Sequence, residues 1–284
     1  MELTHGIIKG LLPRRAADGH KGDFGKVFCV CGSVGYTGAP MFASRAAVRC
    51  GCGLVFLAVP QAIWTVAAVK SDEAMVFPAP DREGRLSLAA EESLRRRAGE
   101  CDAVLLGCGL GRGEETDALS RRLLDIRKPL VLDADGINAL AGHIDKLEHR
   151  RGLTTVLTPH GGEFARIAVP GASREESAAA FAARHGVFLI LKGHRTVIAA
   201  PDGRLAVNPI GNSGMAKGGS GDVLAGMVLS LLGQGMEPFD ACCGAVYLHA
   251  LAGDLAAREL TERAMTPSDL VEYIPRAYRE IEHS

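Results

Sequence analysis

Short apolar runs alternate along this chain with longer segments of helical pattern, and this alternation limits the possible folds most strongly. The strand-like runs lie at residues 26–31, 54–59, 73–77, 103–106, 130–133, 156–158, 187–191, 196–200 and 204–207. The helical segments lie at residues 39–49, 91–98, 116–126, 175–185, 222–232, 238–260 and 267–281. Strands that alternate with helices favour an α/β fold with one doubly wound, mostly parallel sheet flanked by helices. The Asp202-Gly203 pair predicts a hairpin between the last two strands.

Composition agrees with one large domain. The chain has 284 residues, of which 47% are hydrophobic, and this is enough to bury a sizeable core. Only 5% are aromatic, and small residues suit helices that pack closely on a parallel sheet. No linker or repeat divides the sequence, so residues 1–284 are predicted to form a single domain in which 1–20 are an N-terminal extension.

Charge and cysteine content exclude several classes of partner. The formal net charge is -1, so no overall field favours nucleic acid or an anionic membrane. No apolar run is long enough to span a membrane, and residues 1–20 do not read as a signal peptide. There are eight cysteines without a CxxC pattern, so zinc binding by them is disfavoured and a reducing compartment is indicated. We expect a soluble, cytoplasmic protein.

The strongest chemical signal is a glycine-rich run at residues 208–222, NPIGNSGMAKGGSGD, which leads directly into an apolar helix. Glycines let the main chain approach a ligand closely, and free N–H groups at a helix start attract phosphate oxygens. Asp222 puts a negative charge where an anion should bind, which makes sense if it takes a proton from an attacking hydroxyl. This pairing indicates phosphoryl transfer. The alternative is that Asp222 is an ordinary helix-capping carboxylate.

Five further polar or glycine-rich loops follow predicted strands, at residues 32–39, 107–113, 133–138, 159–163 and 192–196. In open α/β sheets, ligands bind outside the carboxyl ends of the strands. We therefore expect a single cleft at this edge. The 107–113 loop fits a dinucleotide fingerprint poorly, and no GxxxxGK[ST] pattern indicates a Walker-type site.

Individual loop residues allow more than one interpretation. Asp133 and Asp135 are either turn or capping residues or ligands for substrate or magnesium. His160 either makes a local hydrogen bond or contacts substrate. Glu163 either occupies the first turn of a helix or belongs to the site. Lys192 ends a buried strand and needs a counter-ion, which a phosphate or a nearby aspartate would supply.

Six motifs in the same order resemble those of the ADP-dependent NAD(P)H-hydrate dehydratases, a family in the ribokinase-like superfamily. They are KGDFGKVFCVCGSVGYTGAP, GLG after AVLL, DADGINAL, LTPHGGEFAR, LKGHRT and GNSGMAKGGSGDVLAG, and they span residues 20–235. The resemblance implies a lyase for metabolite repair. Such an enzyme uses ADP as co-substrate to phosphorylate the hydroxyl of hydrated NADH or NADPH, and then eliminates phosphate. It also implies a stand-alone dehydratase and a homo-oligomer, with a homotetramer as the expected form. Phosphoryl transfer normally needs charge neutralisation, so we expect Mg²⁺ as cofactor.

The resemblance also implies roles for individual residues, with Asp222 as the catalytic one. The hydrate would contact Ala39, Gly109, His160 and Asp222. The nucleotide would contact Lys192, Gly193, His194, Arg195, Thr196 and Gly221. The anion site expected in the glycine-rich run adds Gly218, Gly219 and Ser220 to the nucleotide contacts. No residue is assigned as a metal ligand. Cys108 stands where the family usually has proline, and this puts the geometry at Gly109 in question.

Two other functions remain open. A small-molecule kinase of the same fold, of the hydroxymethylpyrimidine or hydroxyethylthiazole kinase type, would leave the phosphate on its product. A non-catalytic nucleotide sensor would bind ADP or NADPH without turnover.

Overall fold

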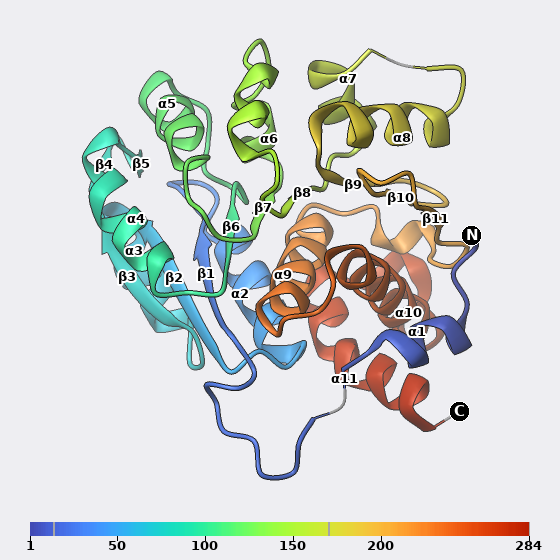
Figure 1. The fold of residues 1–284 in the computed structure, drawn as a ribbon. Coiled ribbons are helices and arrows are strands. Elements are labelled where there is room, and N and C mark those ends of the chain that lie inside the picture. The colour runs from blue at the N-terminus through green and yellow to red at the C-terminus, as the bar shows by residue number, and fades with distance from the viewer. Residues whose placement is uncertain (14, 170, 284) are drawn as a thin grey trace.

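A nine-stranded sheet forms the centre of the molecule (Figure 1). The structure is a computed structural model, and it describes residues 1–13, 15–169 and 171–283. The sheet strands are β1 Lys26–Val30, β2 Leu54–Pro60, β3 Met75–Ala79, β6 Ala103–Leu106, β7 Leu130–Leu132, β8 Thr155–Leu157, β9 Phe188–Leu191, β10 Val197–Ala199 and β11 Leu205–Val207. Their spatial order is β11-β10-β9-β8-β7-β6-β1-β2-β3, and only the pairs made by β10 are antiparallel. The predicted fold class is therefore confirmed, and β10–β11 is the expected hairpin.

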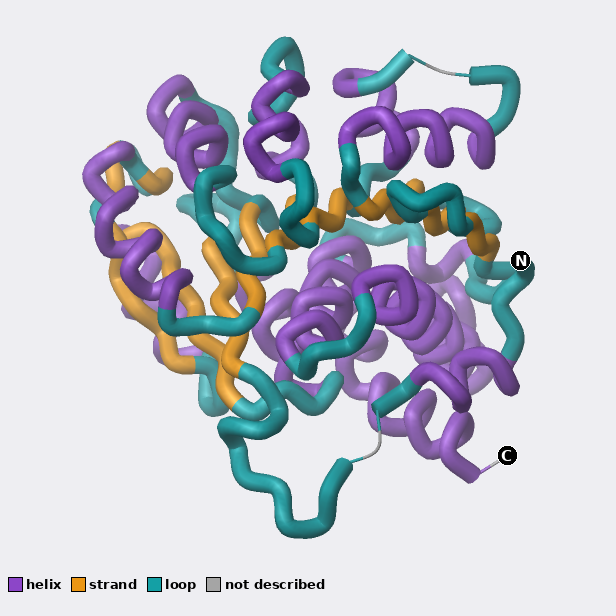
Figure 2. Tube along the Cα trace, in the orientation of Figure 1, coloured by secondary structure: helices purple, strands orange, loops and turns teal. Residues whose placement is uncertain are grey.

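Helices cover both faces of this sheet, as the tube in Figure 2 shows. One face carries α1 His5–Leu11, α2 Gly38–Arg49, α3 Gln61–Lys70, α9 Ser220–Gly233, α10 Pro238–Ala264 and α11 Pro267–His283. The other carries α4 Glu91–Gly99, α5 Glu114–Leu123, α6 Asp135–Asn138, α7 Gly161–Ile167 and α8 Arg174–His185. Smaller elements are the β4 Asp81–Arg82 and β5 Arg85–Leu86 pair and the 3₁₀ turns η1 Leu88–Ala90, η2 Ile144–Arg150 and η3 Ser213–Met215. None of the helices in the described part of the chain has the length and apolarity needed to cross a membrane.

The pleat of β1 shows why a continuous apolar run forms a central strand. Val27 and Cys29 belong to the core under α2 and α9, whereas Phe28 and Val30 belong to the core on the opposite face. A strand buried on both sides needs apolar residues at every position. All eight cysteines are free and buried, and a free buried cysteine packs as a small apolar side chain.

Two helices were not expected from the sequence. Helix α1 contains Ile8, which is fully buried, and Leu3 just before it is 1% exposed, so the first residues pack into the core. Helix α3 begins directly after β2 with Pro60 as its N-cap residue. Its sequence is apolar on all sides and therefore lacks the periodicity that marks an amphipathic helix. Most expected boundaries shift by one to three residues, as is usual at element ends.

Helix α9 is held close to α2 by a glycine. A Cβ at Gly226 would lie 2.1 Å from the carbonyl oxygen of Ala43, so only glycine allows this backbone approach. The contact fixes the position of α9, and with it the glycine-rich run that precedes the helix.

A buried arginine supports the connection between α5 and β8. Arg150 is 1% exposed, and its guanidinium donates to the carbonyl oxygens of Leu124, Ile126, Lys128 and Thr154 and to Oγ1 of Thr155. Burial lowers its pKa to about 10, so it stays charged at neutral pH.

Replacing Arg150 by methionine is expected to lower the free energy of unfolding by about 1–3 kcal/mol, because buried carbonyls would lose their donor. Urea unfolding followed by circular dichroism measures this change. The neighbouring Arg151 pairs with Glu148 on the surface, and Arg151→Met should cost only about 0–1 kcal/mol. If both variants lost the same free energy of unfolding, Arg150 would not have the supporting role given to it here.

Candidate active site

A cavity of about 920 Å³ opens beside the carboxyl ends of β7, β8 and β9. Its wall includes Asp133 after β7, His160 after β8 and residues 192–196 after β9. Residues 215–222 close the other side at the start of α9. The cavity therefore lies where ligands bind in open α/β sheets, and its size suits a small-molecule cofactor or nucleotide.

Asp222 lies on the cavity wall in the first turn of α9. The N-cap residue of this helix is Gly219, so Asp222 is not its capping residue. Burial raises the pKa of Asp222 to about 7, and the nearby charge of Asp133 adds to the rise, whereas a hydrogen bond from Cys108 and the charge of Lys192 act against it. A carboxyl with this pKa exchanges protons near neutral pH, as a general base requires.

The amides before Asp222 are only partly free. The Ser220 N–H donates to the carbonyl oxygen of Lys217 at 3.2 Å, so this amide of the glycine-rich run is already used within the protein. Within the described residues, the N–H groups of Gly218, Gly219 and Gly221 have no protein acceptor. Gly219 has φ 109°, which turns the chain into the helix. Three free amides at a helix start form a site for anionic oxygens.

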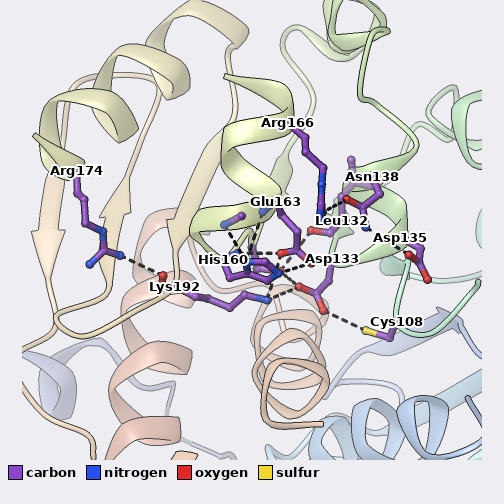
Figure 3. Close-up of polar contacts among 12 residues, drawn as sticks. Cys108, Leu132, Asp133, Asp135, Asn138, His160, Glu163, Arg166, Arg174 and Lys192 are labelled. Atoms are coloured by element: carbon purple, nitrogen blue, oxygen red, sulfur yellow. Dashed lines mark hydrogen bonds and ion pairs between the residues drawn. The ribbon is translucent and has the colours of Figure 1, made fainter. Parts of the chain in front are cut away.

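The counter-ion of Lys192 is an aspartate (Figure 3). Lys192 Nζ lies 2.8 Å from Oδ1 of Asp133 and 4.0 Å from Oε2 of Glu163. Thr158 Oγ1 donates to the same Asp133 oxygen at 2.6 Å. Burial alone would lower the pKa of Lys192, but the charges of Asp133 and Glu163, together with the hydrogen bond to Asp133 and the nearby Cys108, outweigh burial and raise it. The charged lysine on the cavity wall therefore has a protein counter-ion.

His160 forms the N-cap of α7 together with Glu163 (Figure 3). Its Nδ1 accepts from the Gly162 N–H at 2.9 Å, and Glu163 Oε2 accepts from the His160 N–H at 2.8 Å. An accepting Nδ1 carries no proton, so the proton of the neutral ring is on Nε2. His160 therefore makes the local hydrogen bond that was one of its two interpretations. Glu163 likewise occupies the first turn of a helix. The ring still lines the cavity and is exposed.

Asp135 serves the turn after β7. It is the first residue of α6, and its Oδ2 accepts from the Gly111 N–H at 2.9 Å, which ties the 107–113 loop to this helix. Asp133 belongs to the one group of described residues whose side chains could together bind a metal ion. The other members are Cys108 and Asp222, and the possible ligand atoms of the three lie within 4.8 Å of one another. Mg²⁺ prefers oxygen ligands. A thiol and an aspartate already bonded to Lys192 do not fit a resident magnesium ion.

Ala39 and Gly109 lie together, but outside the wall of the large cavity. A Cβ on Gly109 would lie 2.8 Å from Cβ of Ala39 and 3.0 Å from Cβ of Tyr36. Gly109 has φ 64°, and Ser33 Oγ donates to its carbonyl oxygen at 2.9 Å. Two of the residues expected to contact the hydrate, Ala39 and Gly109, therefore lie next to each other near the start of α2. The other two, His160 and Asp222, line the cavity.

The loop at residues 192–196 lines the cavity throughout, as expected for a ligand loop. Arg174 braces it from α8 by donating to the carbonyl oxygens of Leu191 and His194, each at 2.8 Å. Arg195 has φ 54° and pairs with Glu2 at 2.7 Å, and Thr196 Oγ1 donates within the loop. These contacts hold the loop in its shape from within the protein.

Several residues on the cavity were not singled out from the sequence: Asn208, Lys217, His249 and Glu262. His249 Nε2 lies 3.0 Å from the Ser220 carbonyl oxygen, and burial lowers its pKa to about 4. His249 is a single histidine in an apolar helical segment, and nothing in the sequence indicates that it lies at the cavity. Lys217 lies inside the glycine-rich run, so the sequence could have predicted its place near the site but not its hydrogen-bond partners.

The fold and the site define a ribokinase-like α/β protein. A family model described as NAD(P)H-hydrate dehydratase matches residues 27–276, and the chain belongs to this family.

Individual relatives agree with this assignment. The bifunctional NAD(P)H-hydrate repair enzyme of Moorella thermoacetica is 44% identical over 287 residues, which cover 99% of this chain and 54% of the relative. The ADP-dependent (S)-NAD(P)H-hydrate dehydratase of Neisseria meningitidis serogroup B is 38% identical over 85% of this chain and 80% of its own length. The crystal structure of the ADP/ATP-dependent NAD(P)H-hydrate dehydratase from Bacillus subtilis, co-crystallised with ATP/Mg²⁺, matches with a TM-score of 0.81 and 31% identity over 98% of both chains. The chain spans about half the length of most of the curated relatives it matches.

Proposed function

We propose that this chain catalyses the ADP-dependent dehydration of hydrated NADH and NADPH, giving the reduced cofactor, AMP and phosphate. The family match supports the reaction class, and the name of the Neisseria relative supports ADP as phosphoryl donor. The observation that carries the proposal is the position of Asp222, a half-buried carboxyl on the cavity wall beside three free amides.

The first chemical step is phosphoryl transfer. The hydroxyl oxygen of the hydrate attacks the terminal phosphorus of ADP, the bond to AMP breaks, and Asp222 accepts the hydroxyl proton. The N–H groups of Gly218, Gly219 and Gly221 stabilise the charge on the transferring group, each donor contributing about 2.7–4 kcal/mol by analogy with oxyanion holes. Proton transfer to a positioned base adds about 10²–10⁴ in rate.

The second step is elimination. The ring nitrogen of the hydrate donates its electron pair, the bond between carbon and the phosphate oxygen breaks, and phosphate leaves. Loss of a proton from the adjacent carbon restores the double bond of the reduced nicotinamide. Ala39, Gly109 and His160 are proposed to contact the hydrate during both steps, and residues 192–196 with Gly221 to hold the AMP portion.

Magnesium is proposed to enter with the nucleotide, since the donor group around Asp133 and Cys108 does not form a resident site for it. Its usual ligands in nucleotide enzymes are phosphate oxygens, water and one or two carboxylates. The ATP/Mg²⁺ in the Bacillus structure supports a metal-bound nucleotide as the partner of this fold. We also propose that residues 1–284 act as one domain in a cytoplasmic homo-oligomer, a homotetramer being the form to test first.

Product analysis tests the proposed reaction. Purified protein is incubated with chemically hydrated NADPH, Mg²⁺ and either ADP or ATP. Recovery of absorbance at the reduced nicotinamide band, with one phosphate released per cofactor, is the expected result. A stable phosphoester would instead indicate a small-molecule kinase, and binding of ADP without turnover would indicate a sensor.

The pH dependence of kcat/KM is expected to show an acid limb with a midpoint near 7. Asp222 must be ionised to accept a proton, and its pKa is raised to about 7, so the rate rises with pH through this range and then levels off. His249 stays neutral across it because its pKa is lowered to about 4. Initial rates between pH 5 and 9 measure the limb, with intrinsic fluorescence as a control for unfolding. A midpoint near 4, as for an ordinary carboxyl, would contradict the role of burial.

A further inference from the structure

Lys217 lies inside the glycine-rich run, but its ammonium group binds the far end of another helix. Lys217 Nζ donates to the carbonyl oxygens of Glu262 at 3.3 Å and Arg263 at 2.9 Å, and also to that of Met265. These carbonyls belong to the last residues of α10 and its C-cap. The final carbonyls of a helix lack partners within the helix and carry partial negative charge, so a lysine ammonium is a suitable cap for them.

The residues before Lys217 are attached to the same helix. The Gly211 N–H and Nδ2 of Asn212 donate to the carboxylate of Asp254, at 3.1 and 2.8 Å. Ser213 Oγ donates to Oε2 of Glu262 at 2.5 Å. The loop from 211 to 217 is therefore tied to α10 at successive points along the helix, and Lys217 is the tie nearest to the free amides.

The end of α10 has an unusual shape at the place where Lys217 binds. Thr261 has φ 70° and ψ 153°, which a β-branched residue rarely adopts. Such outliers persist only where surrounding interactions hold them, and they cluster at functional sites. The bend at Thr261 comes directly before the three carbonyls that Lys217 binds, so the ammonium is one of the interactions that hold it.

On the other side, Lys217 leads directly into the anion site. Its carbonyl oxygen accepts from the Ser220 N–H at 3.2 Å, and this hydrogen bond begins α9. The amides of Gly218, Gly219 and Gly221 lie within four residues of Lys217. Any movement of Lys217 would therefore move these donors.

We infer that Lys217 is a positioning residue, whose ammonium anchors the glycine-rich run to the C-terminal end of α10 and so sets where the free amides meet the donor phosphate. The inference rests on the proposed function for the identity of that donor. An ammonium has three donors, and here each has a carbonyl partner, which favours anchoring over direct contact with the phosphate.

The test compares Lys217→Met, Lys217→Arg and Lys70→Gln with the wild-type chain. Methionine matches the length of lysine without donors, arginine keeps a charged donor, and Lys70 is an exposed lysine at the end of α3 that controls for net charge. Lys217→Met is expected to lower kcat by about 10²-fold, since a displacement of about 1 Å can cost that much. The KM for ADP should rise and that for the hydrate should stay unchanged. Lys217→Arg should restore most of the loss, and Lys70→Gln should match the wild type.

Two measurements keep this inference separate from the proposed function. Hydrogen exchange without nucleotide should show faster exchange of residues 211–221 in Lys217→Met and little change elsewhere. Calorimetry should show weaker ADP binding by Lys217→Met. Ser213→Ala removes an uncharged donor to Glu262, so it should change the loop exchange and the ADP affinity in the same direction but by less. Wild-type binding of ADP without dehydration would overturn the proposed function alone. Unchanged loop exchange, or equal ADP affinity in wild type and Lys217→Met, would overturn the inference.

Discussion

Asp222→Asn is expected to lower kcat by about 10²–10⁴-fold, while ADP binding stays close to that of the wild type. The amide side chain keeps the shape of the carboxyl but cannot accept the hydroxyl proton. The three free amides lie on the main chain and are not altered by the substitution. Steady-state rates with hydrated NADPH, together with calorimetric titration of ADP, measure the two quantities separately.

Folding controls separate lost chemistry from lost structure. The pKa of Asp222 is raised to about 7, above its unfolded value, so the folded state favours the neutral form. Stability from this preference is present at low pH and is lost as pH rises from about 4 through 7. Asp222→Asn should therefore unfold at the same or a higher temperature than wild type at pH 8. Asp145→Asn, at an exposed carboxylate in η2, should leave the rate unchanged. A near-normal rate for Asp222→Asn would reject its role as base.

Gly219→Ala is expected to reduce kcat by about 10²–10³-fold, the loss found when an oxyanion-type donor is displaced. Gly219 has φ 109°, and a Cβ there would lie 2.7 Å from the Phe42 ring and 3.1 Å from Cβ of Pro267. An alanine at this φ is strained as well as crowded, so we expect the main chain to move and to shift the amides on either side.

Gly218→Ala is the matched control for this prediction. A Cβ at Gly218 would meet nothing within 4 Å, so the same chemical change one residue earlier should keep most of the activity. Stopped-flow rates at saturating ADP and hydrate compare the two variants directly. If Gly218→Ala and Gly219→Ala lowered kcat by the same factor, the exact position of the Gly219 and Gly221 amides would have little importance for the rate.

The sequence predicted the fold and the edge of the sheet at which the site lies. Continuous apolar runs such as β1 and β6 are recognisable because a strand buried on both faces tolerates few polar residues. The loops after β7, β8 and β9 then follow, since the carboxyl ends of parallel strands share one edge. Helix α3 was not recognisable because its apolar residues do not repeat with a helical period.

Partners distant in sequence could not be predicted. Lys192 required a counter-ion, but its choice of Asp133, 59 residues away, depends on the order of β7, β8 and β9 in the sheet. The capture of Lys217 by carbonyls at the end of α10 depends on how that helix packs and bends. The sequence also does not show that the Ser220 amide is already used at the first turn of α9. The residue types therefore predicted the kind of chemistry. Tertiary packing determines which charged groups and amides are already paired within the protein and which can still bind a ligand.

A crystal structure of this chain with bound ADP would show which groups contact the terminal phosphate. We expect this phosphate to lie within about 2.7–3.2 Å of the Gly219 and Gly221 nitrogen atoms, with the Asp222 carboxylate facing its open side. A terminal phosphate bound elsewhere in the cavity, with these amides in contact only with water, would contradict it.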